Sequence, residues 1–117
     1  MERECALKEL IDKELAAVCF VRDYVEFQFD GPTFRALSSP RLFVGDDDFT
    51  FPEPGSRDMF CTLIGKKIEQ VKVSPDVSIE LLFEYGDRLV VPLDAENRVG
   101  PEAANYTRGL NQGVFVW

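Results

Sequence analysis

Histidine is absent from the 117 residues of this chain, and that absence removes a large share of enzyme chemistry. Histidine is the most frequent general base, the usual activator of a nucleophile and the most frequent zinc ligand. The sequence also contains no Gly-x-Gly-x-x-Gly and no Walker pattern, so it offers no recognisable phosphate-binding loop. We therefore expect a protein that is not an enzyme, with no catalytic residues, no metal site and no cofactor.

Long apolar runs are missing as well. No segment approaches the roughly 20 consecutive apolar residues that a helix needs to span a bilayer. The first residues, Met1-Glu2-Arg3-Glu4, are mixed in charge and lead into no long apolar region, unlike a signal peptide. We therefore expect a cytoplasmic protein.

Cysteine is sparse, and its three copies form no motif. Cys5, Cys19 and Cys61 are odd in number and show no short pairing spacing. In a reducing compartment such residues are expected to be small, buried and apolar. None has a neighbouring base in a recognisable motif that would make it a nucleophile.

Positive charge is scarce relative to negative charge. The chain has 13 Lys and Arg against 21 Asp and Glu, for a net charge of −8. Nucleic-acid binding needs the opposite sign, because cations must neutralise the phosphates. Anionic membrane surfaces are disfavoured for the same reason. A protein partner is thus expected to be basic, since a strong net charge speeds the encounter with an oppositely charged molecule.

The chain contains the same unit twice. Leu10-Ile11-Asp12-Lys13 returns as Leu63-Ile64-Gly65-Lys66, a shift of 53 residues. The shift grows by one at the first turn and by one more at the second, which brings Phe34 onto Leu89. An apolar content of 45% is ordinary for one globular domain of this length, here residues 1–117.

Each half reads as a short amphipathic helix followed by alternating strands. The halves cover about 1–37 and 56–93, with a hairpin linker at 38–55 and a closing strand at 114–117. Residues 97–111 read as a loop with one brief strand. The expected strands are Leu15–Val21, Val25–Phe29, Thr33–Leu37, Arg41–Val44, Phe49–Phe51, Ile68–Val73, Val77–Phe83 and Leu89–Leu93.

These elements predict an α+β fold. Two pseudo-repeated helix-plus-antiparallel-strand halves would form one domain, either sandwich-like or a half-open barrel. Residues that hold equivalent places in the two halves should share one core, namely Leu10, Val18, Phe27, Leu63, Val71 and Leu81.

The second half carries turn and core patterns of a kind seen elsewhere. Leu63-Ile64-Gly65 is followed by Ile68 and Val71, then by a hairpin from Leu81 to Val91, and Gly113 to Trp117 forms a Gly-x-aliphatic-x-Trp ending. In these features the chain resembles a group of small uncharacterised bacterial domains with a duplicated half. The resemblance implies the fold and assigns no catalytic residue.

The segment between the halves is the candidate binding site. It gathers negative charge around two aromatic residues. In protein-binding patches, charges raise the rate of association and aromatic side chains supply much of the binding energy. The candidate binding residues are Asp46, Asp47, Asp48, Phe49, Phe51 and Glu53. An alternative is that both phenylalanines pack inward beneath a polar turn. The three aspartates do not match the ligand spacing of an EF-hand.

Two classes of function remain open from the sequence. The first is a non-catalytic acidic protein-binding module. Within this class we favour an immunity- or inhibitor-type protein that neutralises a basic toxin or enzyme. The second is a small-molecule or peptide-binding domain with a pocket between the halves, as a subunit of a larger assembly. The sequence does not set the oligomeric state.

Overall fold

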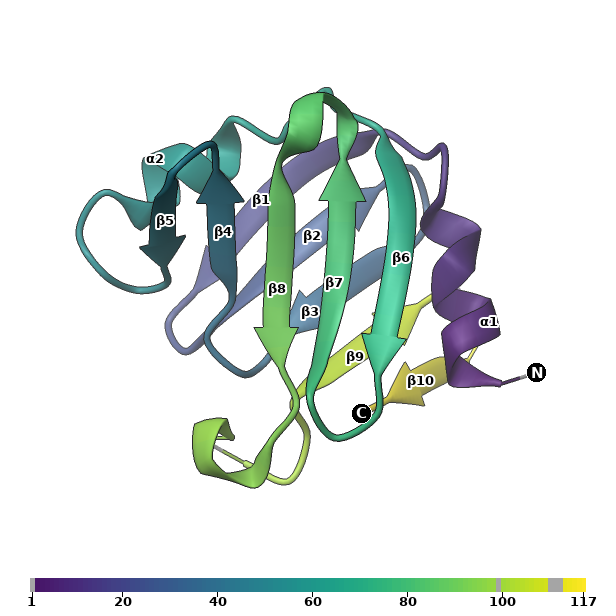
Figure 1. The fold of residues 1–117 in the computed structure, drawn as a ribbon. Helices are drawn as coiled ribbons and strands as arrows, with labels where there is room; N and C mark the ends of the chain where they lie inside the picture. The colour runs from purple at the N-terminus through teal and green to yellow at the C-terminus, as the bar shows by residue number, and fades with distance from the viewer. Residues whose placement is uncertain (1, 99, 110–112) are drawn as a thin grey trace.

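Strands with one apolar face dominate the chain, and they assemble into two antiparallel sheets that pack face to face (Figure 1). The computed structural model describes residues 2–98, 100–109 and 113–117. Sheet 1 has the order β1-β2-β3-β9-β10, and sheet 2 has the order β5-β4-β8-β7-β6. The strands are β1 (Leu15–Val21), β2 (Tyr24–Phe29), β3 (Thr33–Ala36), β4 (Arg41–Val44), β5 (Asp47–Thr50), β6 (Ile68–Ser74), β7 (Ser78–Phe83), β8 (Arg88–Pro92), β9 (Ala104–Thr107) and β10 (Val114–Val116).

The helices are short, so the domain is mostly β rather than the α+β fold that the sequence predicted. The α-helices have five residues in α1 (Arg3–Leu7) and six in α2 (Ser56–Cys61). Single 3-10 turns occur at η1 (Lys8–Leu10), η2 (Glu84–Gly86) and η3 (Ala95–Asn97). Within the described residues the strands form a sandwich and no closed barrel. No helix in the same residues is long and apolar enough to cross a membrane.

The strands of the two predicted halves pair in the same pattern. Each half has a helix followed by a three-stranded antiparallel meander, β1-β2-β3 or β6-β7-β8. A register irregularity lies between Leu15 and Ala17 in β1, and its equivalent lies between Ile68 and Gln70 in β6. The paired residues also match, because Phe27 lies opposite Phe34 just as Leu81 lies opposite Leu89.

The two halves meet along two equivalent segments that hydrogen-bond to each other reciprocally. Asp12 N donates to Ile68 O at 2.7 Å, and Gly65 N donates to Leu15 O at 2.8 Å. Leu15 N donates to Lys66 O at 3.0 Å, and Ile68 N donates to the carbonyl of Lys13 at 3.1 Å. Asp12 and Gly65 both have positive φ, 71° and 92°. The contact therefore has an approximate two-fold symmetry.

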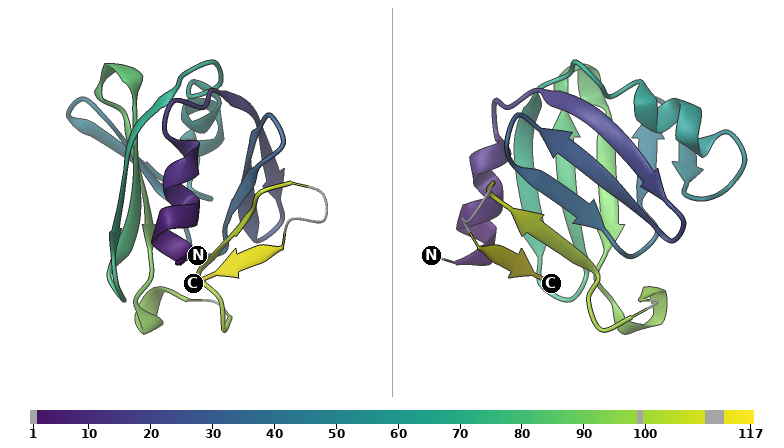
Figure 2. Two further views of the ribbon diagram at one scale, coloured as in Figure 1. Left: turned by 90° about the vertical axis from the view of Figure 1, so that its right-hand side faces the viewer. Right: turned by 180° about the vertical axis from the view of Figure 1, so that it is seen from behind.

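The halves also exchange elements, which the sequence did not predict. The β4–β5 hairpin follows β3 in the chain but pairs with β8, and the β9–β10 hairpin follows β8 but pairs with β3. The helices cross over too: α1 and η1 pack near β10 and β6, whereas α2 packs against β1, β4 and β5 (Figure 2). Each half thus completes the sheet and closes the side of the other half.

The linker hairpin and the C-terminal hairpin are therefore equivalent parts of the repeat. Phe49 lies opposite Leu42 in one hairpin, as Phe115 lies opposite Tyr106 in the other. The brief strand expected within residues 97–111 is β9. Residues 99, 110 and 111 of that segment lie outside the described residues.

One core fills the space between the sheets. Of the six residues predicted to share it, Leu10, Phe27, Leu63, Val71 and Leu81 are buried there, while Val18 is partly buried and packs against it. The remaining large buried side chains come from both halves, so both halves contribute to one shared core. They include Phe34, Phe60, Phe83 and Tyr106.

Candidate functional site

The predicted acidic segment lies at one end of sheet 2, where β5 is the last strand (Figure 1). Gly45, with a φ of 60°, supplies the left-handed conformation of the tight turn between β4 and β5. Asp46, Asp47, Asp48 and Glu53 are all exposed. This hairpin, from Arg41 to Glu53, is hereafter the acidic hairpin.

One carboxylate of the acidic hairpin has a basic partner across the strands. Asp48 Oδ2 accepts a hydrogen bond from Arg41 Nη2 at 2.8 Å, and both side chains are about half exposed. Such exposed pairs contribute little to stability. Asp46, Asp47 and Glu53 form no ion pair with other described residues. Their charge is therefore available to a partner.

The two phenylalanines predicted as anchors face the core, as the alternative interpretation held. Phe51 is only 3% exposed, and its ring stacks on Phe20 with 6.0 Å between the ring centroids. Phe49 is partly buried and packs against the same core. Alternation along β5 turns Phe49 inward, and Phe51 follows directly after the strand. Phe51 is thus buried, while Phe49 keeps part of its surface exposed.

A different aromatic residue, Phe43, reaches the surface of the acidic hairpin. Phe43 lies on the outer face of sheet 2, partly exposed, opposite Asp48 on β5 and Arg88 on β8. The guanidinium carbons of Arg41 and Arg88 lie 5.2 Å and 4.4 Å from the centroid of its ring. These distances are typical of cation–π contacts. Alternation with buried Leu42 is the sequence signal that could have placed Phe43 outward.

Partly exposed apolar residues extend this surface over the neighbouring strands. Leu82 on β7 lies opposite Arg88, and Val90 on β8 lies opposite Arg41. Glu80 holds Arg88 through an ion pair at 3.3 Å. Aromatic residues and arginine are enriched at the energetic centres of protein interfaces. We call Arg41, Phe43, Leu82, Arg88 and Val90 the sheet-2 patch.

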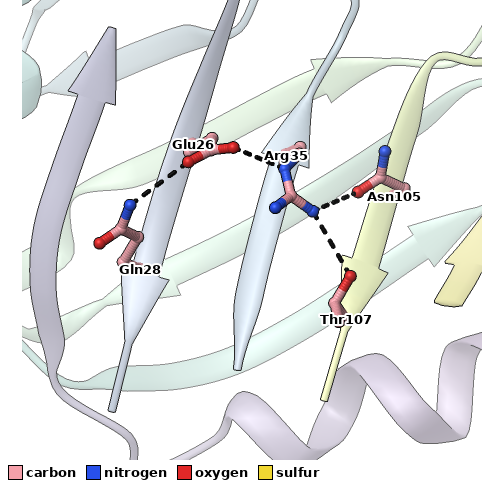
Figure 3. Close-up of polar contacts among 5 residues, drawn as sticks. All are labelled: Glu26, Gln28, Arg35, Asn105 and Thr107. Carbon is pink, nitrogen blue, oxygen red and sulfur yellow. Dashed lines mark hydrogen bonds and ion pairs between the residues drawn. The ribbon is translucent and has the colours of Figure 1, made fainter. Parts of the chain in front are cut away.

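The same positions on sheet 1 carry a closed polar network instead (Figure 3). Arg35 on β3 donates from Nε to Glu26 on β2 at 2.6 Å. Its Nη1 donates to Asn105 at 3.2 Å and to Thr107 at 3.4 Å, both on β9. Gln28 completes the network by donating to Glu26 at 3.3 Å. These groups satisfy one another, so we assign them to cross-strand stabilisation rather than to binding.

A second polar cluster joins η1 to β9. Arg108 donates from Nε to Glu9 Oε1 at 2.9 Å, and it also donates from Nη2 to Glu9 Oε2. The hydroxyl of buried Tyr106 donates to Glu9 Oε1 at 3.4 Å. The hydrogen bond from Arg108 lowers the pKa of Glu9. Burial, followed by the charge of Glu9, raises the pKa of Tyr106 to about 12. Sequence reasoning missed this cluster, because its members lie far apart in the chain.

The cysteines are not where the sequence placed them. Cys5, Cys19 and Cys61 are free and exposed, so the prediction that they are buried is wrong. Cys5 lies on the outer side of α1, whose buried residues are Ala6 and Leu7. Cys19 faces outward from β1, an edge strand that the sequence suggested was fully buried.

Among the described residues, no group of three or more Cys, Asp or Glu side chains could hold a metal ion. Comparison with protein-family models, curated proteins and solved structures found no match. The candidate site consists of the acidic hairpin and the adjoining sheet-2 patch, and it is defined by the exposure and charge of their side chains.

Proposed function

We propose that this domain is a non-catalytic, acidic protein-binding module of the immunity or inhibitor type, which binds a basic toxin or enzyme. The observation that carries the proposal is the exposed charge of Asp46, Asp47 and Glu53 beside a surface aromatic residue, Phe43. The net charge of −8 acts in the same direction. The resemblance to small bacterial domains remains a prediction about the fold.

The two parts of the site have separate tasks in this proposal. Exposed carboxylates raise the rate of encounter with a cationic surface more than they raise the final affinity. Phe43 and its flanking arginines Arg41 and Arg88 supply the area that becomes desolvated on contact. Arg41 links the tasks, because it binds Asp48 and also lies over Phe43.

The proposal is tested by capture of proteins from a lysate of the cells that encode the chain. The test variant carries Asp46→Asn, Asp47→Asn and Asp48→Asn. The control variant carries Asp23→Asn, Glu69→Gln and Asp76→Asn, which remove the same charge at exposed sites on other turns and strands. Quantitative mass spectrometry should find basic proteins with the wild type and the control, and a strong loss with the test variant. Equal capture by all three would reject the acidic hairpin as the site.

A pocket supports the second candidate function, binding of a small molecule or peptide. It has a volume of 390 Å³ and lies where the halves meet, beside Lys13, Leu15, Ile64 and Gly65. Ile64 is 44% exposed there. A ligand of this pocket should raise the melting temperature of the wild type and not that of Ile64→Lys. The acidic-hairpin variant should still bind such a ligand.

A further inference from the structure

We propose that a cavity beside α1 binds a free amino acid with an aromatic side chain, whose ring takes a place that the other half fills with a ring of its own. The cavity has a volume of about 530 Å³ and lies between α1, the β6–β7 turn and Trp117, which follows β10 (Figure 1). Pockets that bind small molecules usually have volumes of about 300–1,000 Å³. This cavity shares no lining residue with the acidic hairpin or with the pocket at Ile64.

Trp117 holds the place that Phe51 has in the other half. Each residue directly follows the outer strand of its hairpin, β10 or β5. Each donates its backbone N–H to the neighbouring strand or its entry, Trp117 to Ala104 O at 2.9 Å and Phe51 to Pro40 O at 3.1 Å. Both side chains are buried, with 8% and 3% of their surface exposed. The two rings are therefore equivalent parts of the repeat.

The space beside these two rings is filled in one half and open in the other. Phe20 stacks on Phe51, with 6.0 Å between the ring centroids. Val73 stands at the place of Phe20, as the matching pairs of β1–β2 and β6–β7 show. Val73 and Trp117 both line the cavity, and among the described residues no aromatic ring packs on Trp117. The smaller side chain thus leaves room for a ring from a ligand.

Two arginines of the cavity wall keep hydrogen-bond donors for an anionic group. Arg3 donates from Nη1 to Val116 O at 2.8 Å. Arg98 donates from Nε to Leu93 O and from Nη1 to Pro101 O, both at 2.9 Å. These neutral carbonyl groups fix the guanidinium groups, and neither forms an ion pair with other described residues. Since a guanidinium has five N–H donors, each retains donors that a carboxylate can accept.

Carboxylates without an ion pair line the same cavity. Glu2 and Asp76 are exposed and pair with no cation among the described residues, whereas the third acid of the lining, Glu4, pairs with Lys8 at 3.4 Å. The cavity thus presents unpaired charges of both signs beside an apolar surface. A zwitterion complements both signs, while a simple anion or cation would face like charge on one side. With its ring against Trp117, an aromatic amino acid meets all three parts of the wall.

Fluorescence tests the site directly, because Trp117 is the only tryptophan of the chain. Titration with L-phenylalanine should change its emission and saturate, and isothermal titration calorimetry should give the same affinity. Phenylalaninamide, 3-phenylpropionate and L-alanine lack the carboxylate, the ammonium group and the ring, respectively. Each should bind at least about tenfold more weakly than L-phenylalanine, the loss expected for one charged hydrogen bond or one buried ring.

A cavity-filling variant tests the comparison between the halves. Val73→Phe places in the cavity the ring that Phe20 supplies in the other half. It should keep the far-ultraviolet spectrum and the cooperative melting of the wild type, and bind L-phenylalanine at least about tenfold more weakly, because the ligand's place is occupied.

Charge variants test the arginines independently of that substitution. Arg3→Gln and Arg98→Gln should weaken binding of L-phenylalanine and leave binding of phenylalaninamide unchanged, because the amide has no carboxylate to hold. Arg57→Gln is the matched control, since Arg57 lies over Phe51 as Arg3 lies over Trp117, and it should bind like the wild type. No saturable signal with L-phenylalanine at millimolar concentration, equal affinity for all the ligands, or full binding by a folded Val73→Phe would each overturn the proposal.

Discussion

Leu15 and Ile68 occupy the same place in the two halves of the chain, and so do Glu26 and Glu80, but the residues around the two glutamates differ. On sheet 1, Glu26 belongs to a closed network with Arg35, Gln28 and β9. On sheet 2, Glu80 holds Arg88, and Val90 stands at the place of Arg35. The pairing of the strands is thus the same in both halves, while the side chains on the outer surfaces differ. Function should be sought where the halves differ.

The largest effect should come from separating the halves. Because each half receives its last two strands and its closing helix from the other, we expect fragments 1–54 and 55–117 to be unfolded alone and to fold when mixed. Circular dichroism and proton NMR of each fragment and of the mixture provide the measurement. Cooperative melting of either fragment alone would show that the exchange of elements is not required.

Leucine truncation should affect the two halves equally. Leu10 and Leu63 are both fully buried at equivalent positions, so Leu10→Ala and Leu63→Ala should each cost about 2–5 kcal/mol of unfolding free energy. Ile64→Ala, at the neighbouring 44% exposed side chain, is the control and should cost much less. Denaturant melts measure all three. A loss below about 1 kcal/mol for Leu63→Ala would mean that the turn after α2 is not packed against the core as described.

The cluster of Glu9, Tyr106 and Arg108 exists in one half only, since Leu42 stands at the place of Tyr106. The pKa of Tyr106 rises from 10.0 to about 12 on folding, so the folded state holds its proton more tightly. This stabilisation is complete below about pH 10 and is lost as the pH rises towards 12. Tyr106→Phe should remove that part of the alkaline loss of stability and cost about 0.5–1.5 kcal/mol at neutral pH.

Denaturant melts between pH 8 and pH 11.5 provide the measurement, with Tyr24→Phe, on the outward-facing side of β2, as the control. An alkaline profile of Tyr106→Phe that overlays the wild type would contradict the assignment.

The junction between the halves offers a smaller test. Gly65 has a φ of 92°, and an added Cβ would meet only Glu14 Oε1 at 3.8 Å, so Gly65→Ala is strained by its backbone and not by a clash. It should cost about 1–2 kcal/mol. Asp12→Gly, at the equivalent position with a φ of 71°, should change stability by less than about 0.5 kcal/mol in thermal melts. Equal losses for both variants would show that the two positions do not share one conformation.

The repeat, the strand bounds and most of the core could be predicted from local patterns. Strand β1 has the predicted bounds, and the slip of the register at both turns is present in the pairing of Phe34 and Leu89. These features follow from alternation and turn chemistry, which act between near neighbours in the chain. A hairpin of Arg41–Val44 with Phe49–Phe51 was likewise expected, although β5 begins at Asp47 rather than at Phe49.

The exchange of elements could not be predicted, because a hairpin with one apolar face fits either sheet equally well. The exposure of Cys19 could not be predicted for a similar reason, because the sequence does not show that β1 is an edge strand. An apolar strand is expected to be buried on both faces unless its place in the sheet is known. Alternation with buried Leu42 could have placed Phe43 outward, but its neighbour Arg88 depends on the register of β4 against β8. Surface chemistry in this protein is decided by pairing between distant segments.

Binding kinetics with the basic protein that the domain captures provide the most direct test of the proposed function. Association of the wild type should be fast at low ionic strength and slow at high ionic strength. The variant with Asp46→Asn, Asp47→Asn and Asp48→Asn should associate more slowly and lose part of its salt dependence, with little change in stability. The control triple variant should keep most of the wild-type rate. An association rate that neither salt nor these substitutions change would contradict binding through the acidic hairpin.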